Sequence, residues 1–485
     1  MLAVGLGELA GASAQELTDT YYVALLHASG CTSNSHEATQ VFGDDIAHRA
    51  AFYLIDTINP AEVLAFYRSN VGAGQPPDLR AQLIEDALAE APSRGREGFE
   101  MMCEVAQGFA GWLGLSAGVR DGLEFIFARW DGRGFPAVAG EEIPLPMRLH
   151  HVVRDASVFM TVGGMQEACE VIGRRSGAAY EPRLAELAVQ HLPEMLAELD
   201  EARMWDHALA SEPAPVIWIQ PEDIDDAFST FAAITGLKSP WLREHSISAA
   251  DLAEAAAWRM GLPQDQVSAV RRAALAGDLG RVGISNAIWE KPAPLGFGEW
   301  ERVRLHPHFT ERAFAQSQAL APIGLLAGAH HERLDGSGYH RGTRAPGLDR
   351  LTRILAAADS YAAMREARPH RAALDAAAAK AELTREAQQG QLDPDAVNAV
   401  LSAAGHKIAE QPRTLPAGLT DRELEVVLAL VRGASNAEMA NTLGISAKTV
   451  GHHVQHIYQK AGVRTRAAAT LWAFEQDLLH SSARA

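Results

Sequence analysis

The feature that most constrains this chain is an internal repeat. The sequence RWDGRGFP at Arg129–Pro136 matches RLDGSGYH at Arg333–His340. A second pair of similar segments, RSGAAYEPRLA at Arg175–Ala185 and QGQLDPDAV at Gln389–Val397, follows the two loops at comparable distances. Two matches in the same order indicate that one folding unit has been duplicated.

The chain is expected to be helical almost throughout. Stretches such as Asp251–Met260 and Arg422–Leu443 are rich in Ala, Leu and Glu and place apolar residues three and four positions apart. Alternating runs of Val, Ile and Thr are scarce. The pattern predicts an all-α protein, and 485 residues are enough for about three domains.

Segments with Pro and Gly interrupt the helical pattern near Ser211–Glu222 and Gln411–Gly418. They divide the chain into three expected domains and two linkers. The expected order is a first copy at 1–210, a linker at 211–240, a second copy at 241–405, a linker at 406–418 and a third domain at 419–480.

Composition favours a cytoplasmic protein. Cys31, Cys103 and Cys169 are too widely spaced for a disulfide framework or a close metal cluster, which fits a reducing compartment. No apolar run is long enough to cross a bilayer, and the first residues lack a basic region typical of a signal peptide. We expect a soluble chain with no membrane partner.

Charge is distributed unevenly along the chain. The net charge is -18, but the segment from Arg413 to the end has eight Lys and Arg against six Asp and Glu residues. Phosphate neutralisation requires Lys and Arg, so only this tail is expected to meet DNA, with weak non-specific binding.

The tail contains the start and stop signals of four helices. Thr420 and Glu423 form a capping-box sequence, S/T-x-x-E. Other signals are helix-ending glycines and helix-capping serines: Gly433, Ser435, Gly444 and Ser446. From Leu419 onward the segment resembles the LuxR-type helix-turn-helix DNA-binding domain along its whole length.

This resemblance implies double-stranded DNA as a partner and a homodimer on paired half-sites. The helix that ends near Tyr458 would enter the major groove with the face opposite its apolar positions. The residues expected at the bases are Lys448, Gly451, His452 and Gln455, and those expected at the DNA backbone are Thr449 and Lys460.

Between His245 and Gly390 the chain contains the motifs HSISAADLAEAAA, GDLGRVG, HPHF, HHERLDGSGYH and AAADSY. This part resembles the HD-GYP branch of the HD phosphohydrolase superfamily, which binds divalent metals such as Fe or Mn and hydrolyses cyclic di-GMP. The metal ligands that the resemblance implies are His245, Asp278, His306, His330, His331 and Asp359.

The match has a gap at the dyad that names the superfamily. The family has His-Asp where this chain has Gly277-Asp278, and glycine offers no side-chain ligand. Arg281 replaces the lysine of the motif and keeps its positive charge, while His340 replaces the GYP proline and adds an imidazole. If the site is active, Asp278 and Arg281 are the expected catalytic residues.

The first copy retains the loop and loses the ligands. Aligned on DGxG, Ile126 and Phe127 stand where the second copy has His330 and His331. The position equivalent to His306 falls at or next to Cys103. The dyad survives as His27-Ala28, and Asp155 is the expected counterpart of Asp359. The counterpart of His245 would precede Met1, so either this copy lacks its first helix or translation starts upstream.

These observations favour a DNA-binding transcriptional regulator whose HD-GYP-like body senses a metal or a nucleotide such as cyclic di-GMP without full catalytic activity. Two alternatives stay open. The same residues could form an active metal-dependent phosphohydrolase, or the body could serve only for dimerisation.

Overall fold

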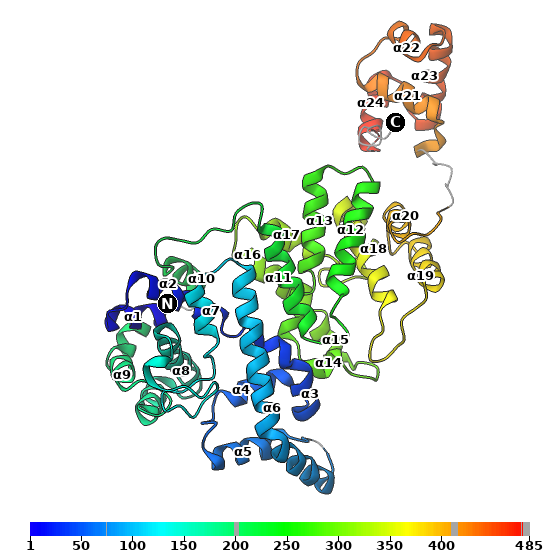
Figure 1. The fold of residues 1–485 in the computed structure, drawn as a ribbon. Coiled ribbons are helices and arrows are strands. Elements are labelled where there is room, and N and C mark those ends of the chain that lie inside the picture. Colours follow the sequence, from blue (N-terminus) through cyan, green and yellow to red (C-terminus); the bar gives the residue numbers. More distant parts are fainter. Residues whose placement is uncertain (74, 198–202, 409–415, 477, 479–485) are drawn as a thin grey trace. The chain divides into compact units, whose positions relative to one another are not determined.

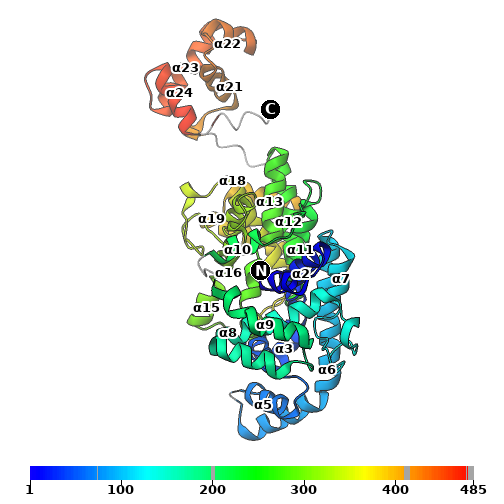
Figure 2. The ribbon, with the colours of Figure 1, turned by 90° about the vertical axis from the view of Figure 1, so that its left-hand side faces the viewer.

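The computed structural model describes residues 1–73, 75–197, 203–408, 416–476 and 478. Within these residues every regular element is a helix, which confirms the predicted all-α fold (Figures 1 and 2). The chain divides into a body, Met1–Ala257 with Gln264–Ala404, and a second unit that contains the C-terminal helices from Gly405 onward.

The first copy occupies the N-terminal part of the body. Its elements are α1 (Leu2–Ala10), α2 (Ala14–Leu26), η1 (Ser29–Asn34), α3 (Ser35–Phe42), α4 (Asp45–Phe52), α5 (Pro60–Asn70), α6 (Pro77–Trp112), α7 (Ala117–Leu123), η2 (Gly140–Glu142), α8 (Leu145–Arg175), α9 (Pro182–Ala197) and α10 (Met204–Ala210). Its apolar core lies mainly between α1, α8 and α9 and between α2, α6 and α7.

The second copy comes next in the chain. Its elements are α11 (Ile224–Leu237), α12 (His245–Arg259), α13 (Gln264–Ala276), η4 (Leu279–Gly283), α14 (Asn286–Trp289), α15 (Phe297–Val303), α16 (His306–Ala315), α17 (Ala321–Ala327), η5 (Ala345–Gly347), α18 (Arg350–Arg365), α19 (Ala376–Gln388) and α20 (Pro394–Ala403).

The two matching segments recur together because each loop is hydrogen-bonded to the later segment of its own copy. In the first copy the Trp130 amide donates to the Ala179 carbonyl at 3.2 Å. In the second the Leu334 amide donates to the Gln391 carbonyl at 2.9 Å. The repeated sequence therefore encodes a repeated backbone pairing.

An arginine ion pair is also repeated. Arg148 on α8 binds Glu181, and Arg353 on α18 binds Asp393. Each arginine also donates Nε–H to the carbonyl five residues before it, at 2.8 Å. These matched contacts fix the register between α8 and α18.

A third repeated contact involves the dyad turn, the segment from His27 to Gly30 in the first copy and from Gly277 to Gly280 in the second. In each copy this turn crosses closely over another helix. A Cβ at Gly30 would lie 1.9 Å from the Met102 carbonyl oxygen, and a Cβ at Gly280 would lie 2.0 Å from the His306 carbonyl oxygen. Only glycine fits such an approach. The dyad positions, three residues before each glycine, are therefore equivalent, as the sequence predicted.

The range 211–240, predicted as a linker, includes a packed helix. α11 contacts η1 and α6 of the first copy and α13 of the second, and it buries Phe228. The prolines before Ile224 misled the prediction, because the 14 residues after them form a continuous helix with a buried face. The two copies thus pack into one unit.

The C-terminal unit is formed by four helices, as predicted: α21 (Asp421–Val431), α22 (Asn436–Leu443), α23 (Ala447–Ala461) and α24 (Arg466–Glu475). Thr420 with Glu423 and Ser435 with Glu438 form capping boxes. Most of the predicted linker 406–418 lies outside the described residues, as do 477, 479 and 480 of the third domain.

Replacing Gly280 by Ala should destabilise the body by about 1–3 kcal/mol, because the new Cβ must displace the His306 backbone. Thermal unfolding measures the change. Gly283→Ala is the matched control, since its Cβ would meet only the Phe309 ring at 3.5 Å. Equal melting temperatures for the two variants would contradict the close crossing.

Candidate metal centre

Two buried histidines, His306 and His330, direct their Nε2 atoms toward the same point. His306 and His330 each donate Nδ1–H to a backbone carbonyl, of Val303 and Ala327, at 2.6 Å. The hydrogen-bonded tautomer leaves each Nε2 as an acceptor, and the two Nε2 atoms lie 3.2 Å apart. Two facing acceptors without a proton between them repel each other, and a shared cation would remove that repulsion.

Asp278 adds a carboxylate to the same point. Its Oδ1 lies 3.4 Å from Nε2 of both His306 and His330. Burial alone would raise the pKa of Asp278, but the charge of the Arg281 guanidinium, 2.8 Å away, holds that pKa well below its ordinary value. The carboxylate is therefore charged and suited to a metal.

Four side chains each place one possible ligand atom within 4.8 Å of the others: Asp278, His306, His330 and His331. Among the described residues, no other group of His, Cys, Asp and Glu side chains does so. Burial holds the pKa of His306 at about 4, so its imidazole is neutral and able to ligate. Imidazole and carboxylate donors suit Mn, Fe or Zn. The donor set thus fits a divalent transition metal.

The other two predicted ligands flank this group. Asp359 Oδ2 lies 3.4 Å from His331 Nδ1, and its Oδ1 lies 3.1 Å from His245 Nε2. Burial would lower the pKa of His245, but hydrogen bonds to Asp359 and Glu366 and the charge of Asp278 raise it to about 9. His245 therefore links carboxylates as an imidazolium in the absence of metal.

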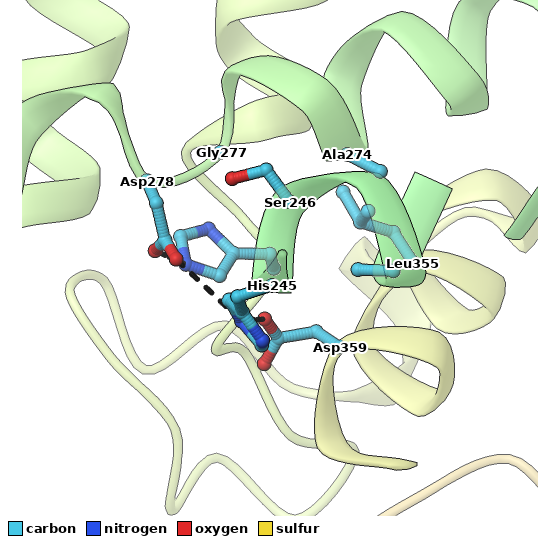
Figure 3. Close-up of a pocket in the computed structure, with 9 residues that line it drawn as sticks. His245, Ser246, Ala274, Gly277, Asp278, Leu355 and Asp359 are labelled. Carbon is cyan, nitrogen blue, oxygen red and sulfur yellow. Dashed lines mark hydrogen bonds and ion pairs between the residues drawn. The ribbon is translucent and has the colours of Figure 1, made fainter. Parts of the chain in front are cut away.

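Gly277 leaves a hole beside the ligands (Figure 3). A cavity of about 10 Å³, room for about one water, is lined by Gly277, Asp278, His330, His245 and Asp359 among others. A Cβ at Gly277 would make only ordinary contacts, 3.4 Å to the Ala273 carbonyl oxygen and 3.5 Å to His330 Nδ1. The structure thus has space where the family's histidine would begin.

Two residues that contact the centre, Glu366 and Trp289, were not predicted from the sequence. Glu366 Oε2 lies 3.0 Å from His245 Nδ1, within ion-pair distance. The Trp289 ring lies 5.5 Å from the His306 ring and 4.8 Å from the Arg281 guanidinium. Neither residue lies in a recognised motif, so only packing reveals them. His340 does not join the ligands: it lies near Glu311 and His308.

In the first copy a guanidinium replaces a metal ligand. When the two copies are aligned on Arg148 and Arg353, the residue equivalent to Asp359 is Arg154, and not Asp155 as expected from the sequence. The partly buried Arg154 donates its Nε–H to Asp155 Oδ1 at 2.7 Å. Asp155 also accepts hydrogen bonds from Arg175 and Tyr180. A fixed cation here opposes metal binding.

Three buried histidines near the dyad position of the first copy are held neutral. His27, at the position of Gly277, packs on His150 with ring centroids 4.1 Å apart. Burial lowers the pKa of His27 to about 4 and that of His151 to about 3, and it lowers that of His150 well below the ordinary value. The dyad is thus split: the first copy has the histidine and the second has the aspartate.

The predicted DNA-contacting residues lie on α23. Val450 and Ile457 are buried, while Lys448, Thr449, His452 and Gln455 are exposed and Gly451 is half-buried. Lys460 is exposed too, but its Nζ binds Glu423 Oε2 at 2.6 Å and the Gly418 carbonyl oxygen at 2.8 Å. Lys460 therefore has a structural role within the unit.

Comparisons with known proteins agree with this organisation. Residues 229–396 match the model of the HD domain, and residues 417–473 match that of the luxR family of bacterial regulatory proteins. The C-terminal segment is 41% identical over 61 residues to the response regulator VraR of Staphylococcus aureus, covering 13% of this chain and 29% of that protein. The C-terminal unit is a LuxR-type domain, which implies DNA binding.

The body is similar to phosphodiesterases. It is 30% identical over 371 residues to 3'3'-cGAMP-specific phosphodiesterase 3 of Vibrio cholerae, covering 75% of this chain and 80% of the relative. It is 28% identical over 268 residues to phosphodiesterase 1 of the same specificity and organism, covering 53% and 62%.

A solved structure supports the fold. The crystal structure of a cyclic GMP-AMP-specific phosphodiesterase of V. cholerae aligns with a TM-score of 0.57 at 24% identity, over 85% of this chain and 92% of that one. The chain belongs to the HD-GYP-type phosphodiesterase family, extended by a LuxR-type domain. Among the described residues, no helix has the length and apolarity to span a membrane.

The buried His27 makes stability depend on pH. With a pKa of about 4 in the fold and 6.5 as its ordinary value, His27 takes up a proton on unfolding, so stability is full above pH 6.5 and falls toward pH 4. His27→Gln should reduce the stability loss between pH 7 and pH 5 by about 2 kcal/mol, measured by urea unfolding. An unchanged loss of stability between pH 7 and pH 5 in His27→Gln would contradict this linkage.

Proposed function

We propose that this protein is a DNA-binding regulator whose second copy binds a divalent metal and a cyclic dinucleotide, and that occupancy of this site changes DNA affinity while turnover is slow. The observation that supports it best is the convergence of Asp278, His306 and His330 on one point beside the empty position at Gly277. This arrangement keeps most of a metal centre and lacks one ligand.

The donor set assigns roles to the chain's own residues. Asp278, His306, His330 and His331 would hold the metal, whose chemistry is to neutralise phosphate charge and to acidify a bound water. Arg281, already held by Asp278 and the Trp289 ring, would place a positive charge beside the phosphate. His245 would orient Asp359.

Loss of the dyad histidine is the reason to expect slow turnover. A water in the cavity beside Gly277 is a weaker ligand than imidazole, so the metal charge density and position that activate the attacking water are less well defined. Binding depends less strictly on that geometry than bond cleavage does. The centre is therefore better suited to recognition than to hydrolysis.

The relatives and the site together indicate the ligand class. The two phosphodiesterases named above are specific for 3'3'-cGAMP, and a shorter match of 146 residues is to a cyclic di-GMP phosphodiesterase of Xanthomonas campestris. Both compounds are cyclic dinucleotides with two phosphates, which suit a metal with an adjacent arginine. The C-terminal unit supplies the output, and homodimerisation would place two copies of α23 on paired half-sites.

The decisive experiment measures the affinity of the full chain for a DNA sequence selected by that chain, at fixed salt, with Mn²⁺ and with either 3'3'-cGAMP or cyclic di-GMP. A dinucleotide-dependent shift of about five-fold or more supports the regulator. Product release followed on the same samples distinguishes the alternative: turnover comparable to that of a phosphodiesterase, with no effect on DNA, would identify an enzyme.

Gly277→His should bind Mn²⁺ about 10-fold more tightly than the wild type, because an imidazole would replace water as a ligand. Isothermal titration calorimetry gives the affinity, and the variant's hydrolysis of 3'3'-cGAMP should rise. Gly277→Ala is the control for a side chain without a ligand atom. An unchanged affinity in Gly277→His would show that position 277 does not face the metal.

The exposed Lys448 and the bonded Lys460 should behave differently. Lys448→Ala should weaken DNA binding and lower the slope of log affinity against log salt by about 1, with an unchanged melting temperature. Lys460→Met should lower the melting temperature of the C-terminal unit, because buried Glu423 loses its cation. Fluorescence anisotropy and calorimetry separate the two effects.

A further inference from the structure

The two copies meet next to the metal centre. Helix α14 of the second copy packs against α3 of the first. The two helices are equivalent elements, since each comes after the 3₁₀ helix of its own dyad turn. The contact therefore resembles the self-complementary interface of a two-fold dimer, formed here within one chain.

A buried carboxylate of the first copy anchors α14. Asp45, which is fully buried, accepts the Asn286 backbone N–H at 2.8 Å and the Lys238 ammonium at 2.9 Å. Asn286 in turn donates its side-chain amide to the Lys238 carbonyl at 2.6 Å. Burial would raise the pKa of Asp45, but the charge of Lys238 holds it below its ordinary value, so the carboxylate is ionised.

A second contact joins the same helix from the first copy. Glu290, directly after α14, accepts from His36 Nδ1 at 2.8 Å and from Asn286 Nδ2 at 3.2 Å. Asp45 and His36 thus hold both ends of α14. The helix has only four residues, and besides these polar contacts Ile288 and Trp289 pack in a small apolar cluster.

The anchored helix presents Trp289 to the metal centre. The indole Nε1 donates to the Arg281 carbonyl at 3.4 Å, and its ring lies 4.8 Å from the Arg281 guanidinium. The same ring meets His306 edge-on at 5.5 Å. A displacement of α14 would therefore change the surroundings of both Arg281 and a metal ligand.

We infer that the first copy is a positioning subunit for the metal centre of the second: Asp45 fixes α14, and Trp289 on α14 fixes Arg281 and His306. This inference rests on the proposed function in taking the His/Asp group as a metal centre. It gives a task to a copy whose own site has Arg154 in place of a ligand.

The test is the Mn²⁺ affinity of the full chain, measured by calorimetry without nucleotide or DNA. Asp45→Ala alone would leave the Lys238 ammonium buried and unpaired, so the informative variant is Asp45→Ala/Lys238→Met, which removes both charges. It is expected to unfold near the wild-type temperature and to bind Mn²⁺ about 10-fold more weakly, as for loss of other residues that orient metal ligands.

The matched control is Glu181→Ala/Arg148→Met, which neutralises an ion pair within the first copy and is expected to keep the wild-type Mn²⁺ affinity. Trp289→Phe should weaken Mn²⁺ binding as well. If Asp45 acts through Trp289, combining Trp289→Phe with Asp45→Ala/Lys238→Met should produce less than the product of the two fold-changes.

A Mn²⁺ affinity within about two-fold of the wild type in Asp45→Ala/Lys238→Met, or an equal loss in the Glu181/Arg148 control, would overturn the inference. Independent, multiplicative effects of the Trp289 and Asp45 changes would overturn it too. These outcomes are separate from the proposed function: a chain with this Mn²⁺ behaviour but no dinucleotide effect on DNA would retain the inference and lose the proposal.

Discussion

The crossing of the dyad turn over the helix that begins at His306 determines the geometry of the body. Thr310 Oγ1 donates to the Gly277 carbonyl at 2.8 Å and accepts the Gly280 amide at 2.9 Å, while Gly280 packs directly on the His306 carbonyl. This contact brings Asp278 and His306 together from segments 28 residues apart in sequence number. The same glycine crossing recurs in the first copy, so the scaffold has been retained where the ligands have not.

The two copies have each lost a different residue of the His-Asp dyad. The first has His27 and no aspartate, and its site contains neutral histidines and the Arg154 cation. The second has Asp278 and no histidine, and it keeps acceptors that face one another. A buried group of acceptors is costly unless a cation binds, whereas the first copy supplies its own cation. One fold thus supports a metal centre and a metal-independent packing unit.

In the second copy, the sequence motifs identified residues that the structure brings together. The six predicted ligands lie together, since the resemblance on which they rest preserves both residue type and spacing. Prediction was less accurate in the first copy, where Asp155 was assigned one residue away from the position now occupied by Arg154. Without a motif, helix register can be fixed only by contacts such as the Arg148–Glu181 pair. The linker assignment failed at α11 because prolines mark a break in helical structure but do not specify the conformation of the residues after the break.

The sequence by itself determined the helical fold, the duplication, the glycine at the dyad and the C-terminal helix-turn-helix, because periodicity, caps and turns are local properties. Only the tertiary structure decided which acceptors face one another, which exposed lysine is already bonded, and that Asp45 of one copy reaches Asn286 of the other. These are contacts between residues distant in sequence, and their geometry depends on how whole helices pack, which no local pattern specifies.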